Sequence, residues 1–314
     1  MKREKMLDTA ESIFEKAGFH ISRRCCSRPS CFDLAARMEN QLVFLKAHVN
    51  IGSVSAEDAS ELKSISKWFS AASIFLGVKA RGNPLEDDTV YSRYDVYTIT
   101  PKTMEDIVLR RKPPLVEAAP GGYYVRLDGD MIRKRRENMK LSVGKMAEKM
   151  GVSRRTLYGY EKGITKASVS AAYKLAWILG APVAQPVDVF QPKSEEDSSF
   201  LAAAKRTITK HSCVEKVIEK FKEFRLKIAR VKKAPFDFIA QFPDEQLKVI
   251  GGVVDEKEKN VDERAEEILS VSEVVGAQAV FITDGEKTPN NRIPVIRRED
   301  LARVEHLKDF IAKI

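Results

Sequence analysis

The chain has 314 residues, too many for one small core, so we expect two or three domains. Its 54 Lys and Arg against 45 Asp and Glu give a net charge of +9, which favours a polyanionic partner. No run approaches the roughly 18 apolar residues of a transmembrane helix, and the N-terminal segment lacks the apolar core of a signal peptide. These observations exclude a membrane-spanning protein and predict a cytoplasmic one.

The cysteines predict neither a metal site nor a disulfide. Cys25, Cys26, Cys31 and Cys213 lack the paired C-x-x-C spacing of a zinc site. In a reducing compartment they would also stay unbridged. We therefore expect no metal and no cofactor.

Residues 1–112 are predicted to form an α/β domain. Helical spacing of apolar residues from Met6 to Ala17 precedes three expected strands at 20–24, 31–37 and 41–50. Ser55 is then expected to cap an amphipathic helix ending near Phe69. Strands at 73–78 and 94–99 and a helix at 103–109 complete the pattern, which is typical of a layered α/β domain.

The middle of the chain is divided by segments rich in Pro and Gly. Residues 113–128 are predicted to be a linker with one strand, and 183–199 a second linker that contains the run SEEDSS. Between 129 and 180 there are twelve basic and four acidic residues, a net +8 out of the total of +9. Because almost all of the excess charge lies in this segment, it is the expected site of phosphate attraction.

Residues 200–314 repeat the pattern of the first domain. The run FDFIAQF at 236–242 matches FDLAARM at 32–38, and LKVIGGVV at 247–254 matches LVFLKAHV at 42–49. An acidic helix at 262–269, the run VVGAQAVFITDG, a strand at 293–296 and a helix at 298–311 follow in the same order. This similarity at one long offset favours a duplicated domain. Two unrelated α/β domains that share an element order by chance are the alternative.

The central segment LSVGKMAEKMGVSRRTLYGYEKG carries a helix-turn-helix pattern. A small residue is expected where two helices cross, a glycine at the left-handed turn, and a serine cap on the second helix. The residues expected to build this motif are Ala147, Gly151, Val152, Ser153, Leu157 and Tyr160. The spacing predicts an all-α helix-turn-helix domain over 129–182.

With its G-V-S-x-x-T-L turn and Y-E-x-G ending, this segment resembles the XRE or phage-repressor family. The resemblance implies a five-helix bundle whose second motif helix, 153–161, enters the major groove of double-stranded DNA. It implies base or phosphate contacts from Arg154, Arg155, Thr156 and Tyr158, and phosphate contacts from Arg136, Lys145 and Lys162. Each arginine could instead be a solvated or phosphate-facing charge. The resemblance also implies a homodimer.

The first domain resembles the restriction-endonuclease-like fold, with Asp33 and Lys46 in the places of two active-site residues. Active members hold Mg²⁺ with an aspartate and with an acid two residues before the lysine, but that position here is Phe44. A carboxylate lent by Glu11, Glu15 or Glu61 would make a poor substitute. In the repeat, Asp237 corresponds to Asp33 and the sequence match sets Gly251 opposite Lys46. Both domains are therefore predicted to be inactive, with dimerisation, ligand sensing or nonspecific DNA contact as their alternative roles.

As a whole the chain resembles archaeal HTH-type transcriptional regulators: an α+β multidomain protein with a helix-turn-helix domain between two α/β domains. We accordingly expect a DNA-binding regulator that is not an enzyme and that responds to an unidentified small-molecule effector. The alternative is a Mg²⁺-dependent DNA nuclease targeted by the helix-turn-helix, with Asp33 and Lys46 as its catalytic residues.

Overall fold

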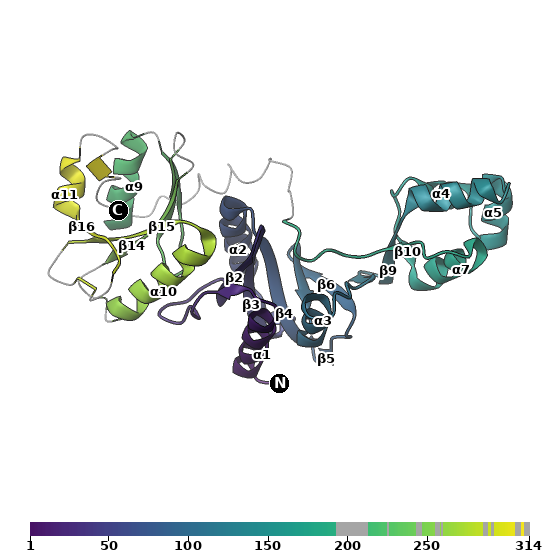
Figure 1. Ribbon diagram of the computed structural model, residues 1–314, viewed down its shortest axis with the longest axis horizontal. Helices are drawn as coiled ribbons and strands as arrows, with labels where there is room; N and C mark the ends of the chain where they lie inside the picture. The colour runs from purple at the N-terminus through teal and green to yellow at the C-terminus, as the bar shows by residue number, and fades with distance from the viewer. Residues whose placement is uncertain are drawn as a thin grey trace. The chain divides into compact units, whose positions relative to one another are not determined.

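The computed structural model describes residues 1–192, 213–224, 226–242, 247–254, 258, 260–284, 288–289, 292–304 and 309–310 (Figure 1). The SEEDSS part of the expected second linker lies outside these residues. Contacts divide the chain into two compact units. The first comprises Met1–Ile13, Val49–Gly52 and Leu76–Val189, and the second comprises Phe14–His48, Ser53–Phe75 and Phe190–Ile314. Among the described helices, none is both long enough and apolar enough to cross a bilayer.

Several strands of an 11-stranded sheet lie in the first unit and lead directly into the helix-turn-helix. β6 (Thr89–Arg93) pairs antiparallel with β7 (Val96–Ile99) and parallel with β8 (Val116–Ala119). β8 in turn forms a hairpin with β9 (Gly122–Leu127). β9 also pairs with β10 (Ala167–Ser168) and β11 (Ala184–Gln185), which lie on either side of the last helix of the motif in the sequence. The unit also contains β5 (Asn83–Pro84) and α3 (Pro101–Val108). The last helix of the motif is therefore joined to β9 through the strands that precede and follow it.

Four helices form the helix-turn-helix domain: α4 (Gly129–Asn138), α5 (Val143–Met150), α6 (Arg154–Glu161) and α7 (Val169–Leu179). Each begins after a residue whose side-chain oxygen accepts a backbone N–H of the first turn. These caps are Asp128, Ser142, Ser153 and Ser168. Such caps define where each helix starts without help from distant residues.

The structure corrects the expected number of helices. Residues 129–182, all of which are described, contain four helices rather than five. After Gly163, whose φ is +67°, the chain does not continue as a helix, because Ala167 and Ser168 pair with Val125 and Tyr124 of β9. The backbone groups there are used in a sheet, so β10 stands between α6 and α7.

The N-terminal half of the second unit contains a three-stranded antiparallel ladder of β1 (His20–Ile21), β2 (Leu34–Met38) and β3 (Gln41–Asn50), followed by α2 (Ala56–Phe69). α1 (Arg3–Lys16), β4 (Ala72–Ala80) and β3, through Val49 and Asn50, contribute residues to both units. Ser55 caps α2 as predicted. β1 is shorter than the strand expected at 20–24, because the next backbone N–H groups bond elsewhere: that of Arg23 donates to Ser270 Oγ and that of Cys26 to Glu267 Oε1.

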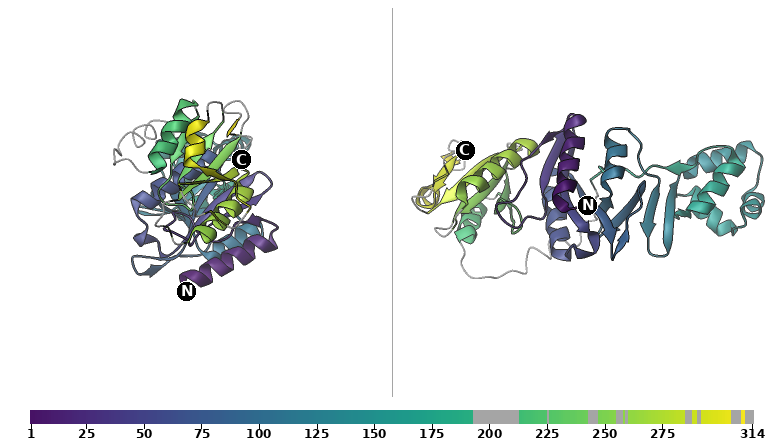
Figure 2. Two further views of the ribbon diagram at one scale, coloured as in Figure 1. Left: turned by 90° about the vertical axis from the view of Figure 1, so that its left-hand side faces the viewer. Right: turned by 90° about the horizontal axis from the view of Figure 1, so that it is seen from below.

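The C-terminal half of the second unit is a five-stranded sheet with helices on both faces (Figures 1 and 2). Its strands are β12 (Lys227–Arg230), β13 (Phe238–Gln241), β14 (Lys248–Val254), β15 (Gln278–Thr283) and β16 (Val295–Arg297), in that spatial order. The first three are antiparallel and the last three parallel. α9 (Cys213–Glu223) and α11 (Arg298–Arg303) cover one face, and α10 (Val261–Val275) covers the other. The order helix, three strands, helix, strand therefore occurs in both halves.

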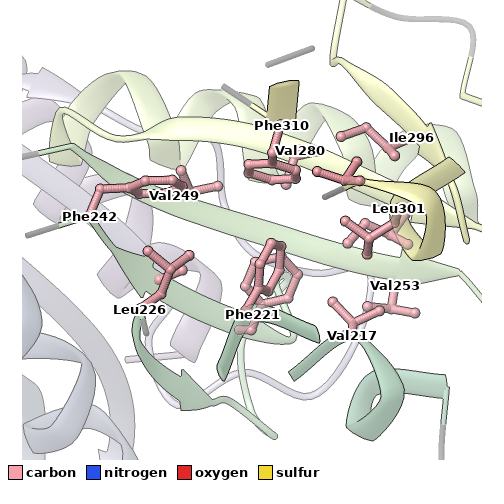
Figure 3. Close-up of a cluster of buried hydrophobic side chains, with 14 residues drawn as sticks. Val217, Phe221, Leu226, Phe242, Val249, Val253, Val280, Ile296, Leu301 and Phe310 are labelled. Atoms are coloured by element: carbon pink, nitrogen blue, oxygen red, sulfur yellow. The ribbon is translucent and has the colours of Figure 1, made fainter. Parts of the chain in front are cut away.

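Phe221 of α9 is central to the core on one face of this sheet (Figure 3). Its side chain is fully buried, and its ring centroid lies 5.3 Å from that of Phe238 and 5.0 Å from that of Phe310. Aromatic rings at such separations add to the stabilisation that burial alone provides. Phe224, which directly follows α9, is only partly buried at the edge of this core.

We predict that Phe221→Ala lowers the free energy of unfolding of the second unit by about 3–5 kcal/mol, because it leaves a cavity among close-packed side chains. The matched variant Phe224→Ala should cost about 1 kcal/mol. Urea unfolding of the two variants measures both values. Equal losses would show that Phe221 does not anchor this core.

Candidate nucleic-acid interface

The turn between α5 and α6 is closed by backbone geometry. Gly151 ends α5 with φ +71°, a left-handed conformation that glycine adopts without steric cost. The N–H of Val152 then donates to the carbonyl of Ala147 at 3.0 Å. Ser153 Oγ accepts the N–H of Thr156 at 3.0 Å and so starts α6. This short corner sets the direction in which α6 leaves α5.

Apolar contacts fix the two helices against the rest of the domain. Ala147, Leu157 and Tyr160 are buried in one cluster with residues of α4, α7 and β9, and Val152 packs against its edge. Since α6 places Leu157 and Tyr160 inward, its opposite face is exposed to solvent, with Arg154, Arg155 and Tyr158 on it.

The first turn of α6 carries the exposed cations. Arg154 and Arg155 are both exposed, and the Thr156 hydroxyl is 2.8 Å from Ser153 Oγ. The Arg154 side chain lies close to α5, because a Cβ built on Gly144 would stand 3.0 Å from Arg154 Nε. The N-terminal end of a helix also attracts anions through its free N–H groups and its dipole. Positive charge and helix polarity therefore act together at this end.

Further exposed side chains surround α6. Tyr158 is 53% exposed, and Lys162 Nζ lies 5.8 Å from the centroid of its ring. Lys145, in the first turn of α5, is also exposed. The structure thus brings Tyr158 and Lys162 together.

Arg136 does not lie on this surface, contrary to the expectation that it contacts phosphate. Its guanidinium donates to both carboxylate oxygens of Glu161, at 2.6 and 3.1 Å, and to the carbonyl of Leu141 at 2.9 Å. Both side chains are more than nine-tenths buried. The hydrogen bonds to Glu161 also raise the pKa of Arg136 above its ordinary value. Arg136 therefore links α4 to the end of α6, and a phosphate contact would require this link to break.

The structure also shows a buried glutamate with two ion pairs that the sequence pattern did not indicate. Glu117 on β8 forms ion pairs with Arg126 on β9 and with Lys166, which directly precedes β10. Glu117 is buried apart from a small fraction of its surface. Because Lys166 lies 49 residues further along the chain, only the folded structure brings the pair together.

In the second unit, Asp33 and Lys46 form a buried pair. Lys46 Nζ donates to Asp33 Oδ1 at 2.8 Å and to the carbonyl of Ser30 at 2.6 Å. The other oxygen of Asp33 accepts the N–H of Ala47 at 2.8 Å. Phe44, where a nuclease needs an acid, is fully buried, with its ring centroid 4.9 Å from that of Phe32.

Two of the carboxylates considered as substitutes have other surroundings. Glu61 Oε1 accepts the N–H of Lys232 at 2.6 Å, and Glu15 is exposed near the end of α1. Among the described residues, no group of three or more His, Cys, Asp or Glu side chains is arranged to hold a metal ion.

Asp237 in the C-terminal half makes the same backbone contacts as Asp33. The N–H of Asp33 donates to the carbonyl of Leu45, and that of Asp237 to the carbonyl of Gly251. Asp237 Oδ2 accepts the N–H of Val253 at 2.7 Å, as Asp33 accepts that of Ala47. These contacts show that Gly252, not Gly251, corresponds to Lys46.

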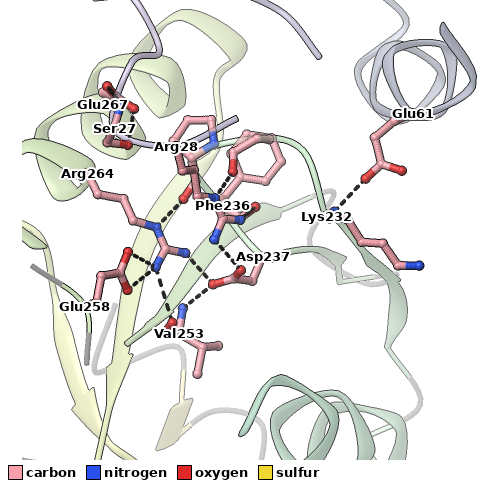
Figure 4. A network of polar contacts seen from close by, with 12 residues as sticks. Ser27, Arg28, Glu61, Lys232, Phe236, Asp237, Val253, Glu258, Arg264 and Glu267 are labelled. Carbon is pink, nitrogen blue, oxygen red and sulfur yellow. Dashed lines mark hydrogen bonds and ion pairs between the residues drawn. The ribbon is translucent and has the colours of Figure 1, made fainter. Parts of the chain in front are cut away.

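Two arginines replace the missing lysine at Asp237 (Figure 4). Arg264 of α10 bonds to Asp237, to Glu258 and to the carbonyl of Pro235, and its side chain is 1% exposed. Arg28, from the N-terminal half, donates to Asp237 Oδ1 at 2.8 Å and to the carbonyl of Phe236 at 2.8 Å. The second carboxylate is thus neutralised partly by a residue of the other half.

The two halves of the second unit contact each other through equivalent hydrogen bonds. In each half, a glutamate on a helix accepts backbone N–H groups from a loop of the other half. Glu267 on α10 accepts the N–H groups of Cys26 and Ser27 at 2.6 and 2.7 Å. Glu61 on α2 accepts the N–H of Lys232, in the corresponding loop of the other half. The rings of Phe32 and Phe236, which directly precede the two aspartates, are 6.3 Å apart. Each half therefore places one loop against the helix of the other.

The cysteines of the N-terminal loop do not present a set of ligands. Cys25 and Cys31 are buried, and Cys26 is exposed. Burial raises the pKa of the Cys25 and Cys31 thiols well above the usual range, so both stay protonated at neutral pH.

Comparison with known families gives two matches. Residues 3–114 match the model of a PD-(D/E)XK superfamily domain, and residues 132–184 match a helix-turn-helix model. The second match covers the four capped helices described above, apart from the first residues of α4.

Curated archaeal proteins match along the whole chain. A protein of Thermococcus kodakarensis, named as an HTH-type transcriptional regulatory protein, is 33% identical over 100% of this chain and 96% of its own length. Proteins with the same name from Methanocella arvoryzae and Archaeoglobus fulgidus are 34% and 32% identical and cover 99% and 98% of this chain. The alignments cover 93% and 96% of those two relatives. A chain of a solved SinR protein/SinI protein complex aligns to 32% of this chain at 22% identity, with a TM-score of 0.17, too low to compare folds.

The pairing of Arg136 with Glu161 predicts a loss of stability on substitution. Arg136→Ala leaves a buried carboxylate without its partner, so we expect the free energy of unfolding of the first unit to fall by about 3–5 kcal/mol. Arg135→Ala, which removes an exposed neighbour of the same type, should change stability by less than about 0.5 kcal/mol. Thermal unfolding without DNA makes the comparison. An unchanged midpoint for Arg136→Ala would return Arg136 to the candidate phosphate contacts.

Proposed function

This chain belongs to the family of archaeal HTH-type transcriptional regulatory proteins, and from that premise we propose that it binds double-stranded DNA in a sequence-specific manner. In this proposal the N-terminal end of α6 enters the major groove. The observation that carries it is the exposure of Arg154 and Arg155 on a helix whose Leu157 and Tyr160 are buried in the domain core. The net charge of +8 on residues 129–180 supplies the attraction for phosphate.

The exposed side chains divide into two roles in this proposal. Arg155, Arg154 and Thr156 lie in the first turn of α6, which is the part of a motif helix that reaches base edges. Lys145 and the pair of Tyr158 and Lys162 flank that turn and contact the sugar-phosphate backbone. Lys134 and Arg135, exposed on α4, take over the phosphate role first expected of Arg136.

Two substitutions separate base contact from phosphate contact. Arg155→Ala should weaken binding to the selected site by about 1–3 kcal/mol and bind random DNA almost unchanged, because a bidentate contact to guanine is lost. Lys145→Ala should weaken binding to both DNAs alike and reduce the dependence of affinity on salt. Titrations with fragments selected from a random duplex library, at stated salt concentrations, measure both effects. Equal weakening on both DNAs by Arg155→Ala would refute base contact by Arg155.

We further propose that neither α/β half hydrolyses DNA, although the first belongs to a nuclease superfamily. Asp33 is occupied by Lys46 and the N–H of Ala47, and the position of the second acid holds the buried Phe44. Asp237 is bonded to two arginines. In our interpretation these carboxylates tie loops to strands. Within the described part of the chain, no group of three or more His, Cys, Asp or Glu side chains is arranged to hold a divalent cation.

We propose domain boundaries that follow this division of functions. An α/β domain spans 1–112, and the segment 113–128, first expected to be a linker with one strand, contains the hairpin of β8 and β9. The helix-turn-helix spans 129–182, a second linker that includes β11 spans 183–199, and a second α/β domain spans 200–314. The matching contacts of Asp33 and Asp237 support the hypothesis that the second domain arose by duplication of the first. A cytoplasmic location and a small-molecule effector remain predictions from the sequence.

The nuclease alternative has a direct test. Supercoiled plasmid incubated with the protein and Mg²⁺ or Mn²⁺ should stay intact, because the buried Phe44 occupies the position of the second acidic ligand. Asp33→Asn is the matched control, since it removes the charge but keeps an oxygen that can accept the N–H of Ala47. Cleavage by the wild type that disappears in Asp33→Asn would establish the nuclease and overturn the proposal.

A further inference from the structure

Gly144 of α5 is a glycine that the helix itself does not need. It lies in the first turn, after the cap at Ser142, and its φ is not among the positive values that favour glycine. Apart from proline, glycine is the least favourable residue inside a helix. The reason for a glycine at this position therefore lies outside α5.

The side chain of Arg154, from the first turn of α6, fills the space beside Gly144. A Cβ built on Gly144 would stand 3.0 Å from Nε, 3.1 Å from Nη2 and 3.2 Å from Cζ of Arg154, closer than side chains normally pack. These three nearest atoms all belong to the guanidinium group. Because position 144 has no side chain, the guanidinium can lie against the backbone of α5.

Arg154 keeps its hydrogen-bond donors for a ligand while it lies in this place. The side chain is exposed, and among the described residues no acceptor is bonded to its guanidinium. Arg136 differs, because its donors are used by Glu161 and by the carbonyl of Leu141. The contact with α5 therefore restricts where the Arg154 guanidinium lies without using the groups that would bind DNA.

We propose that Gly144 is a positioning residue for base recognition: it lets the Arg154 guanidinium rest in one place, from which Arg154 contacts one particular base pair. This inference rests on the proposed function. An arginine side chain with many rotamers loses that freedom when it binds, whereas a guanidinium already in place loses less. A bidentate contact to guanine needs two donors in a fixed geometry, so the placement of Arg154 affects the preference for one base pair more than the affinity for DNA in general.

The size of the side chain at position 144 then determines the effect. A methyl group there requires the Arg154 guanidinium to give way by only a few tenths of an ångström, which a flexible side chain does easily. A leucine side chain would occupy the place of the guanidinium itself and displace it from α5. Gly144→Ala should therefore be mild and Gly144→Leu severe, although both substitutions favour the helix.

Binding to single-base-pair variants of the selected site tests the inference. The site is selected from a random duplex library, and each of its base pairs is replaced in turn. Arg154→Ala should remove the preference at one base pair. We expect Gly144→Leu to reduce the preference at that same base pair about tenfold, and the preferences at the other positions by less than about twofold. Gly144→Ala should retain most of the wild-type preference at every position.

Double variants show whether the effect passes through Arg154. In the Arg154→Ala background, Gly144→Leu should change binding by less than about twofold, because the side chain that it displaces is already gone. Arg155→Ala is the matched background, since it removes the adjacent exposed arginine, and there Gly144→Leu should keep its full effect. Thermal unfolding without DNA accompanies these titrations. Gly144→Leu should not lower the unfolding midpoint, because leucine favours a helix more than glycine does.

Three results would overturn the inference and leave the proposed function intact. The first is an unchanged base preference in Gly144→Leu. The second is a loss of preference that persists in the Arg154→Ala background, since the new side chain would then act on DNA or on the domain directly. The third is an equal weakening of all duplexes by Arg154→Ala, which would make Arg154 a phosphate contact. A wild type without any sequence preference would contradict the proposed function itself.

Discussion

The buried pair of Arg136 and Glu161 is the constraint on which the candidate interface depends. It joins the last turn of α4 to the last residue of α6, while the first residue of α4 packs against the same place. Gly129 has no side chain there because a Cβ would lie 2.4 Å from the carbonyl oxygen of Glu161. With α6 held at its C-terminal end, its N-terminal end is left on the surface. Burying the two charges costs free energy. The hydrogen bonds from Arg136 to Glu161 and to the carbonyl of Leu141 offset this cost.

A second constraint connects the helices to the sheet. β9 pairs with β8, with β10 and with β11, so the segments before α4, between α6 and α7, and after α7 meet on one strand. Glu117 adds ion pairs to Arg126 and Lys166 at the same strand pairs. The helix-turn-helix is therefore joined to the first unit through main-chain hydrogen bonds.

The α/β halves show how a carboxylate can keep its place in a fold while its surroundings change. Asp33 and Asp237 have the same main-chain partners, but one is balanced by Lys46 and the other by Arg28 and Arg264. Because a buried carboxylate is costly unless it is paired, each half supplies a cation by a different route. Arg28 comes from the other half, so part of the charge neutralisation of Asp237 depends on the association of the two halves.

The sequence by itself determined the local elements: the serine caps of α5, α6 and α7, the glycine turn at Gly151, and β3 over Gln41–Asn50 are decided by residues within a few positions of each other. Only the tertiary structure decided the partner of Arg136, 25 residues away, the pairing of β10 with β9, and the alignment of Gly252 with Lys46. Those depend on which surfaces meet after folding. An arginine has the same sequence pattern whether it faces a phosphate or a buried glutamate, and a shift of one residue in strand register leaves the apolar pattern of a fully buried strand almost unchanged.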